Sequence, residues 1–158
     1  PPPLRNHGQR ARADRAALLK RSSGRRAPRE SREVLVAAAV AAAHKAHCPH
    51  SGHPVGAALE SADGSVAVGC NVESDSYPLT VCAERNAVAN AVVAGLSDFT
   101  RIVVVSPSGG APCGGCRQVL FEHGGPELQV ICATPEGEVK LVTTIGELLP
   151  HAFRWQRE

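Results

Sequence analysis

The sequence is poor in aromatic side chains and contains no long apolar run. Among 158 residues there are three Phe, one Tyr and one Trp, and there is no Met. The longest apolar run, Val34 to Ala43, has ten residues, about half of what an α-helix needs to cross a bilayer. A membrane-spanning protein is therefore excluded, and the length favours one domain built around a single core.

The start of the given sequence shows no pattern of a secretory leader. No charged segment followed by an apolar stretch and a small-residue cleavage site opens the chain, so we expect no secretory signal. The absence of Met leads us to expect that the natural start has been trimmed. Six cysteines would allow three disulfides in an oxidising compartment. We expect a cytoplasmic protein instead, and in that compartment clustered cysteines more often bind metal or carry redox chemistry.

Charge is distributed unevenly, although the formal net charge is only +2. Residues 1–30 hold nine Arg or Lys against two acidic residues and carry +7, whereas residues 31–158 carry −5. The basic segment has no aromatic side chain that could stack on a base, and its Pro and Gly/Ser stretches are typical of flexible chain. We expect a flexible basic arm over 1–30, more often a solvated tail than a nucleic-acid contact, and one globular domain over 31–158.

The pattern of residues 31–158 predicts strands that alternate with helices. Ser31 is suited to cap a helix, and Asp63–Gly64 is typical of a hairpin turn. Two prolines make residues 48–54 an irregular loop. A hairpin followed by alternating strands and helices indicates an α/β sandwich with a mixed sheet. The first expected helix begins after the Ser31 cap and includes the Ala-rich stretch 34–45, and the others are 80–94, 116–123 and 145–149. The expected strands are 55–59, 65–72, 102–105, 128–133 and 139–143.

Three cysteines stand at or near the starts of expected helices. Cys113 and Cys116 are three residues apart and present their sulfurs on one helix face, while Cys82 lies near the start of the preceding helix. The positive end of a helix favours thiolate over thiol. If the two helices lie side by side, the three thiolates can bind one Zn²⁺. A fourth position then stays open, as in catalytic zinc sites.

Glu84 is the candidate proton carrier beside this zinc site. Because it is two residues from Cys82, its side chain points elsewhere and can reach a water at the open position. Zinc lowers the pKa of bound water to about 7. A carboxylate beside it can take the water's proton, pass it to a ring nitrogen, and later protonate the departing ammonia. Zinc nucleobase deaminases use this arrangement. Arg85 and Arg117 are placed to hydrogen-bond the sulfurs and to offset their negative charge.

A lone Cys-x-x-Cys pair also occurs in redox proteins and in zinc ribbons. The redox pair normally follows a first strand, whereas this pair follows at least three expected strands. A zinc ribbon needs a fourth ligand. Cys70 and Cys132 lie in expected strands, where a free cysteine is usually a small buried apolar residue. A redox or structural zinc protein is therefore the less favoured alternative.

Longer motifs extend this pattern over most of the chain. They are Gly69–Glu73, Tyr77, Thr80–Arg85, Pro112–Leu120 and Glu147–Pro150. From about Ala37 to Phe153 the sequence resembles the small homotetrameric zinc-dependent cytidine deaminases, with blasticidin-S deaminase as a close relative. The resemblance implies a three-layer α/β sandwich with a mixed sheet of about five strands and helices on both faces. It also implies one Zn²⁺ per subunit on Cys82, Cys113 and Cys116, with Glu84 as the proton shuttle.

The resemblance further implies how a substrate is held. Asn71 and Glu73, two apart on one face of an expected strand, would hydrogen-bond the ribose, and the backbone of Ala83 would contact the pyrimidine. His53 and Val55 match further substrate-contacting positions. A last group would reach into a neighbouring subunit's site: Asp75, Tyr77 and Phe153. The implied activity is hydrolytic deamination of cytidine or deoxycytidine to uridine or deoxyuridine plus ammonia, in pyrimidine salvage.

Three histidines depart from the family pattern. His47 and His50 stand where the family usually has Tyr, and His53 stands where a Phe stacks on the pyrimidine. An imidazole is smaller, polar and able to titrate near pH 6.5. Either base stacking is weaker here, or the pocket holds a cytosine compound with an extra hydrogen-bonding group. A second metal on the histidines spaced every three residues is not favoured, because two prolines interrupt the segment; these histidines are His44, His47, His50 and His53.

Three further functions stay open as alternatives. A deaminase of a modified nucleoside such as blasticidin S shares the three-cysteine site, and Phe153–Arg154–Trp155 somewhat resembles its C-terminal end. A nucleic-acid-binding or editing module could use the basic arm, although polynucleotide deaminases more often have His-Ala-Glu than Cys-Ala-Glu. A non-catalytic zinc protein is the third option.

Overall fold

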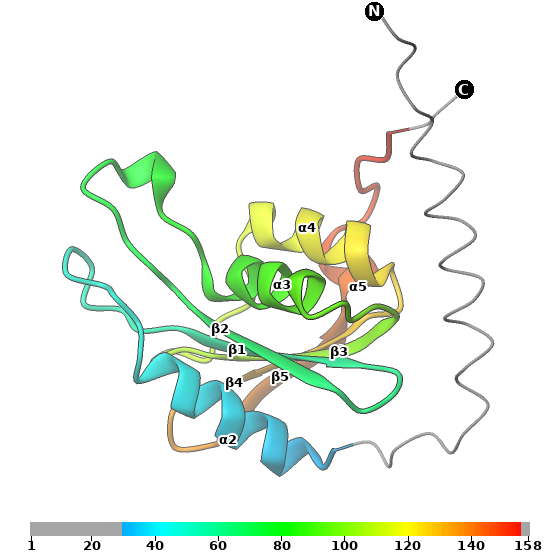
Figure 1. Cartoon of the computed structure of the whole chain (residues 1–158), viewed down its shortest axis with the longest axis horizontal. Coiled ribbons are helices and arrows are strands. Elements are labelled where there is room, and N and C mark those ends of the chain that lie inside the picture. The colour runs from blue at the N-terminus through cyan, green and yellow to red at the C-terminus, as the bar shows by residue number, and fades with distance from the viewer. Residues whose placement is uncertain (1–29, 156–158) are drawn as a thin grey trace, which may run out of the picture.

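The computed structural model describes residues 30–155 and shows a five-stranded sheet between two layers of helices (Figure 1). The predicted arm, apart from Glu30, lies outside the described residues. In chain order the elements are α2 (Arg32–Ala43), β1 (Gly56–Ser61), β2 (Val66–Cys70), the 3₁₀ helix η1 (Tyr77–Leu79), α3 (Ala83–Val93), β3 (Phe99–Val105), α4 (Gly114–Gly124), β4 (Gln129–Ala133), β5 (Val139–Thr144) and α5 (Ile145–Leu148).

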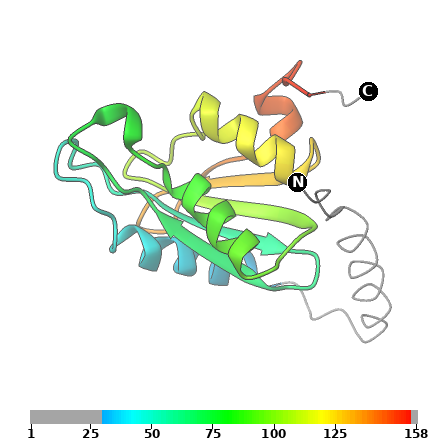
Figure 2. The ribbon, with the colours of Figure 1, turned by 45° about the horizontal axis from the view of Figure 1, so that its top comes forward.

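The sheet is mixed, and its strand order is β2-β1-β3-β4-β5. β3 and β4 pair in parallel, and the other neighbours pair antiparallel. α2 covers one face, and α3, α4 and α5 cover the other (Figures 1 and 2). Each face has its own apolar core, one centred on Leu35 and Val103, the other on Leu59, Ile102 and Leu120. The predicted three-layer α/β sandwich is confirmed.

Local residue choices account for the start of α2 and for the turn between β1 and β2. The Ser31 side chain accepts a hydrogen bond from the Val34 N–H and caps α2 as predicted. The hairpin turn at Asp63–Gly64 is also present, with Gly64 at a φ of +87°, a value that glycine adopts without steric cost.

Among the described residues, no helix is both long and apolar enough to cross a bilayer.

Two predicted helix starts were wrong. α3 begins at Ala83 rather than at residue 80, because Val81 pairs with Val72 in an isolated β-bridge that follows the 3₁₀ turn Tyr77–Leu79. α4 begins at Gly114 rather than at residue 116. In both helices a cysteine, Cys82 or Cys113, occupies the extended N-cap position. The corrected starts place two of the three candidate zinc ligands directly at the positive ends of helices.

Two glycines let helices lie directly against the sheet. A Cβ at Gly69 in β2 would overlap the Ala83 carbonyl oxygen and the Ala87 nitrogen of α3. A Cβ at Gly56 in β1 would overlap the Ala39 carbonyl oxygen of α2. Only glycine permits this spacing, which sets how closely α3 and its N-terminal Cys82 approach the sheet.

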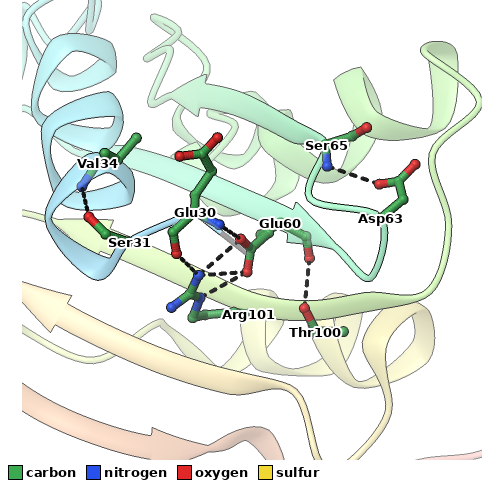
Figure 3. Close-up of polar contacts among 8 residues, drawn as sticks. All are labelled: Glu30, Ser31, Val34, Glu60, Asp63, Ser65, Thr100 and Arg101. Atoms are coloured by element: carbon green, nitrogen blue, oxygen red, sulfur yellow. Dashed lines mark hydrogen bonds and ion pairs between the residues drawn. The ribbon is translucent and has the colours of Figure 1, made fainter. Parts of the chain in front are cut away.

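A buried ion pair fixes the chain where it enters the domain (Figure 3). The side chain of Glu60 is fully buried and accepts hydrogen bonds from Nε and Nη2 of Arg101, each at 2.9 Å. Arg101 Nη2 also donates to the Glu30 carbonyl oxygen at 2.6 Å, and the Glu30 N–H donates to Glu60 Oε1 at 3.0 Å. These contacts hold the first described residue at one end of the β1–β3 pair.

Candidate active site

The three cysteines predicted as zinc ligands meet at the N-termini of α3 and α4. Their sulfurs all lie within 4.8 Å of one another, and Cys82 Sγ is 4.0 Å from Cys113 Sγ. Zinc–sulfur bonds of about 2.3 Å place the sulfurs of a tetrahedral site about 3.8 Å apart, so the arrangement fits one Zn²⁺. In residues 30–155 this is the one group of His, Cys, Asp or Glu side chains with such geometry. The fit confirms the predicted convergence.

The surroundings of the cysteines favour negative charge on sulfur. Hydrogen bonding from the Cys116 thiol, and then from the Arg85 guanidinium, lowers the pKa of Cys82 to about 5 although partial burial opposes this shift. The pKa of Cys116 is raised, because its proton is held by the Cys82 thiolate and its sulfur is desolvated. Arg85 Nη2 lies 3.8 Å from Cys82 Sγ and 2.8 Å from the Thr80 carbonyl oxygen. Arg85 therefore contacts a sulfur as the sequence led us to expect.

Arg117 has different partners from those expected. Its Nε donates to the Pro112 carbonyl oxygen at 2.7 Å and its Nη1 to the Leu148 carbonyl oxygen at 2.9 Å. The expected hydrogen bond to a sulfur is not found, because these two carbonyls take up the guanidinium. Arg117 therefore ties the loop before Cys113 to the end of α5.

Glu84 is the second residue of α3, is 4% exposed, and lines the same cavity as Cys82 and Cys113. Burial raises the pKa of this carboxyl, and the negative charge of Cys82 raises it further, against the opposing effect of a backbone hydrogen bond. A carboxylate with a raised pKa is a stronger base toward the proton that it has to accept. This is the property required of a proton carrier.

A cavity of about 260 Å³ opens beside the cysteines and Glu84. Four residues that the sequence predicted as substrate-contacting line it: His53, Val55, Asn71 and Ala83. Thr80, Ser106 and Ser108 also line it and were not predicted. Ser106 follows β3 directly, at the carboxyl end of a parallel strand. That position, together with the Pro- and Gly-rich loop after it, was the available indication in the sequence.

A larger hollow, of about 510 Å³, lies elsewhere. It runs along α2 and the turn at Pro135–Gly137. α2 covers the sheet face opposite to α3 and α4 (Figure 1), so this hollow is separated from the cysteines by the sheet. Although this hollow is larger than the cavity, it contains none of the candidate zinc ligands and is not the candidate active site.

Asn71 and Glu73 do not share one face of a strand, because β2 ends at Cys70. Asn71 Oδ1 accepts from the Val55 N–H at 2.8 Å, and Asn71 Nδ2 donates to the His53 carbonyl oxygen at 3.0 Å. Glu73 Oε2 accepts from the N–H groups of His50 and Ser51 at 2.8 and 3.1 Å. Glu73 lines an adjoining hollow of about 410 Å³ rather than the cavity itself, and Thr80 borders both.

The histidine-containing loop faces the segment that follows β2. His50 Nε2 lies 3.3 Å from Asp75 Oδ1, and its ring meets the Tyr77 ring edge-on at 5.3 Å. Tyr77 and Phe153 are 70% and 64% exposed, and neither lines the cavity of its own chain. Their predicted contribution to a neighbouring subunit is therefore compatible with this exposure and stays a prediction.

Comparisons with known proteins show that the chain is similar to cytidine deaminases. The model of the cytidine and deoxycytidylate deaminase zinc-binding region matches residues 29–132. The chain is 41% identical over 123 residues to a cytidine deaminase of Sporosarcina psychrophila, which covers 77% of this chain and 90% of that relative. It is 43% identical over 117 residues to a cytidine deaminase of Mycobacterium tuberculosis H37Rv, covering 73% and 84%. A crystal structure of cytidine deaminase from Burkholderia pseudomallei superposes with a TM-score of 0.74 at 48% identity, over 78% of this chain and 100% of that one.

Proposed function

The chain belongs to the zinc-binding family of cytidine and deoxycytidylate deaminases, and on that premise we propose that it catalyses the hydrolytic deamination of cytidine and deoxycytidine to uridine and deoxyuridine, with release of ammonia. One observation carries the proposal: three cysteine sulfurs lie within 4.8 Å of one another, and two of these cysteines, Cys82 and Cys113, line a cavity together with the buried carboxyl group of Glu84.

Cys82, Cys113 and Cys116 would hold the zinc ion and leave one position open. Zinc bound there supplies a nucleophile at neutral pH by lowering the pKa of a water molecule to about 7. Glu84 would take one proton from the attacking water and pass it to N3 of the cytosine ring while the water oxygen bonds to C4. It would then carry the remaining hydroxyl proton to the amino group at C4, so that the C4–N bond breaks and ammonia leaves. The raised pKa of Glu84 supports its acceptance of the proton.

The substrate is held by groups around the cavity. Asn71 and Glu73 are the ribose contacts in this proposal, and the Ala83 backbone and the His53 ring face the pyrimidine. Support comes from the lining of the cavity by Asn71, Ala83 and His53, and from the position of Glu73 in the adjoining hollow. Val55 contributes an apolar wall. The positive charge of Arg85 offsets the net negative charge of three thiolates on one Zn²⁺.

The assembly in this proposal is a homotetramer working in cytoplasmic pyrimidine salvage. Asp75, Tyr77 and Phe153 then complete the site of a neighbouring subunit. Their exposure supports this, as does a set of exposed apolar side chains, Leu79, Val92, Val93 and Trp155. Light scattering should give about four times the chain mass of 16.5 kDa.

The direct test is ammonia release by the purified full chain from a panel of cytidine, deoxycytidine, cytosine, deoxycytidylate and blasticidin S. The proposal predicts turnover of the two nucleosides, with kcat/KM well above that for the other three. Turnover restricted to blasticidin S or deoxycytidylate, or no turnover of either nucleoside, would overturn it.

A further inference from the structure

Ser51 hydrogen-bonds one residue of the cavity, His53, and one residue of the adjoining hollow, Glu73. Its hydroxyl donates to Glu73 Oε1, and its N–H donates to Glu73 Oε2 at 3.1 Å. The same hydroxyl oxygen accepts from the His53 N–H at 3.0 Å. One side chain therefore joins the carboxylate of the adjoining hollow to the backbone of the residue that lines the cavity.

The loop that carries Ser51 has no regular structure of its own. Pro49 breaks it, and Gly52 adopts a φ of +62° beside open space, since a Cβ there would meet no atom within 4 Å. Side-chain contacts from Asn71 and Glu73 hold the loop to the segment after β2. Ser51 itself is exposed, so its hydroxyl is not needed to fill the core.

We propose that Ser51 is a positioning residue that sets Glu73 and His53 at a fixed separation, so that the sugar and the base of the nucleoside are engaged together. This inference rests on the proposed function, because it assigns Glu73 to the ribose and His53 to the pyrimidine. A carboxylate oxygen can accept two hydrogen bonds. Glu73 Oε1 can therefore keep the Ser51 hydroxyl as a partner while it accepts a ribose hydroxyl.

The charge of Glu73 agrees with this arrangement. The hydrogen bond from Ser51 is the largest cause that lowers the pKa of Glu73, and the N–H groups of His50 and Ser51 add to it. The carboxylate is thus kept ionised and aimed by the loop. A free base, which has no ribose, gains nothing from this alignment.

The test compares steady-state kinetics of the wild type, Ser51→Ala and Ser51→Thr on cytidine. A lost hydrogen bond to a charged group should raise KM about tenfold in Ser51→Ala and leave kcat within about twofold. Ser51→Thr keeps the hydroxyl and should restore most of the KM. Ser97→Ala is the matched control, because this exposed serine also donates a hydrogen bond to a carboxylate, that of Asp98, but lines neither the cavity nor the adjoining hollow. The KM of this variant should equal that of the wild type.

A double-mutant cycle shows whether Ser51 acts through Glu73. In a Glu73→Ala background, Ser51→Ala should change KM by less than about twofold. An unchanged KM in Ser51→Ala, no rescue by threonine, or an undiminished effect in the Glu73→Ala background would overturn the inference while leaving the deaminase activity in place. A wild type without turnover of cytidine would overturn the proposed function and the inference together.

Discussion

The chemistry at the residue scale is decided by charge balance around three sulfurs. Three thiolates on one Zn²⁺ leave a net charge of −1, which weakens the ion as a Lewis acid. Arg85 is the cation that contacts a ligand sulfur, and it is held in place by the Thr80 carbonyl. Burial raises the pKa of Glu84 above its usual value, because desolvation disfavours the charged carboxylate.

Replacing Glu84 with Gln removes the proton carrier and keeps the shape of the side chain. We expect kcat on cytidine to fall by about 10²- to 10⁴-fold, the usual contribution of general acid–base catalysis. Zinc content, measured on the same sample, should stay at one ion per chain, because Glu84 is not a ligand. Retention of more than a tenth of the wild-type kcat would exclude Glu84 from this role.

Glu73 gives a prediction for acid pH. Its pKa is lowered from the usual 4.5 by the Ser51 hydroxyl first and by the His50 and Ser51 N–H groups next. A lowered native pKa means that its hold on the loop is fully present above the usual value and is lost as the pH falls through the native pKa. The amide resonances of His50 and Ser51 should therefore titrate below pH 4.5, and the midpoint should move upward in Ser51→Ala. Equal midpoints in the two proteins would contradict this assignment.

Residue types and spacing were enough to identify some of these groups and not others. The meeting of Cys82, Cys113 and Cys116, with Glu84 nearby, was predictable, because two short motifs place these residues at or near the starts of two expected helices. The partners of Arg117 were not, because they are backbone carbonyls brought near it by the packing of α5 against α4.

At the scale of elements, the site depends on how two helix starts are placed. Cys82 and Cys113 are N-cap residues of α3 and α4, so a shift of either helix moves a ligand. Gly69 holds α3 against β2, since any side chain there would strike the backbone of α3.

Gly69→Ala should therefore destabilise the protein by about 1–3 kcal/mol, the usual cost of overpacking. Urea denaturation measures this change in the free energy of unfolding. Gly114→Ala is the matched control, because a Cβ at Gly114 has no neighbour within 4 Å, and it should cost less than about 0.5 kcal/mol. Equal stabilities of the two variants would show that β2 and α3 have room to separate.

The order of the elements followed from the sequence, and their exact limits did not. The β-branched run at Ile102–Val105 predicted a strand, yet β3 starts three residues earlier, at Phe99. Phe99 is 7% exposed and pairs with Ser61 of β1, a contact between segments far apart in sequence. Local patterns carry no information about such pairings.

At the scale of the whole molecule, the chain combines a basic segment before Glu30 with an acidic remainder. The question is whether catalysis needs the basic segment. The side chains of Glu60 and Arg101 hold the backbone of Glu30 at one end of β1 and β3. The cavity borders the other end of these strands, near Val55 and Val104.

Deletion of residues 1–29 should therefore leave kcat/KM on cytidine within about twofold of the full chain. The reason is that every residue assigned to the site lies between Ser51 and Phe153. Kinetics of the full and shortened chains on cytidine, and binding of both to a single-stranded oligonucleotide, check this. A large loss of kcat/KM would mean that the basic segment takes part in the site.

The central claim is that Cys82, Cys113 and Cys116 hold a zinc ion that deamination requires. Removal and return of the metal test it most directly. Protein treated with a chelator and then dialysed is assayed for zinc by mass spectrometry, for fold by circular dichroism, and for ammonia release from cytidine. The account predicts loss of activity with the zinc and recovery at one zinc per chain, with no recovery in Cys113→Ser. Full activity in folded protein that contains no metal would contradict it.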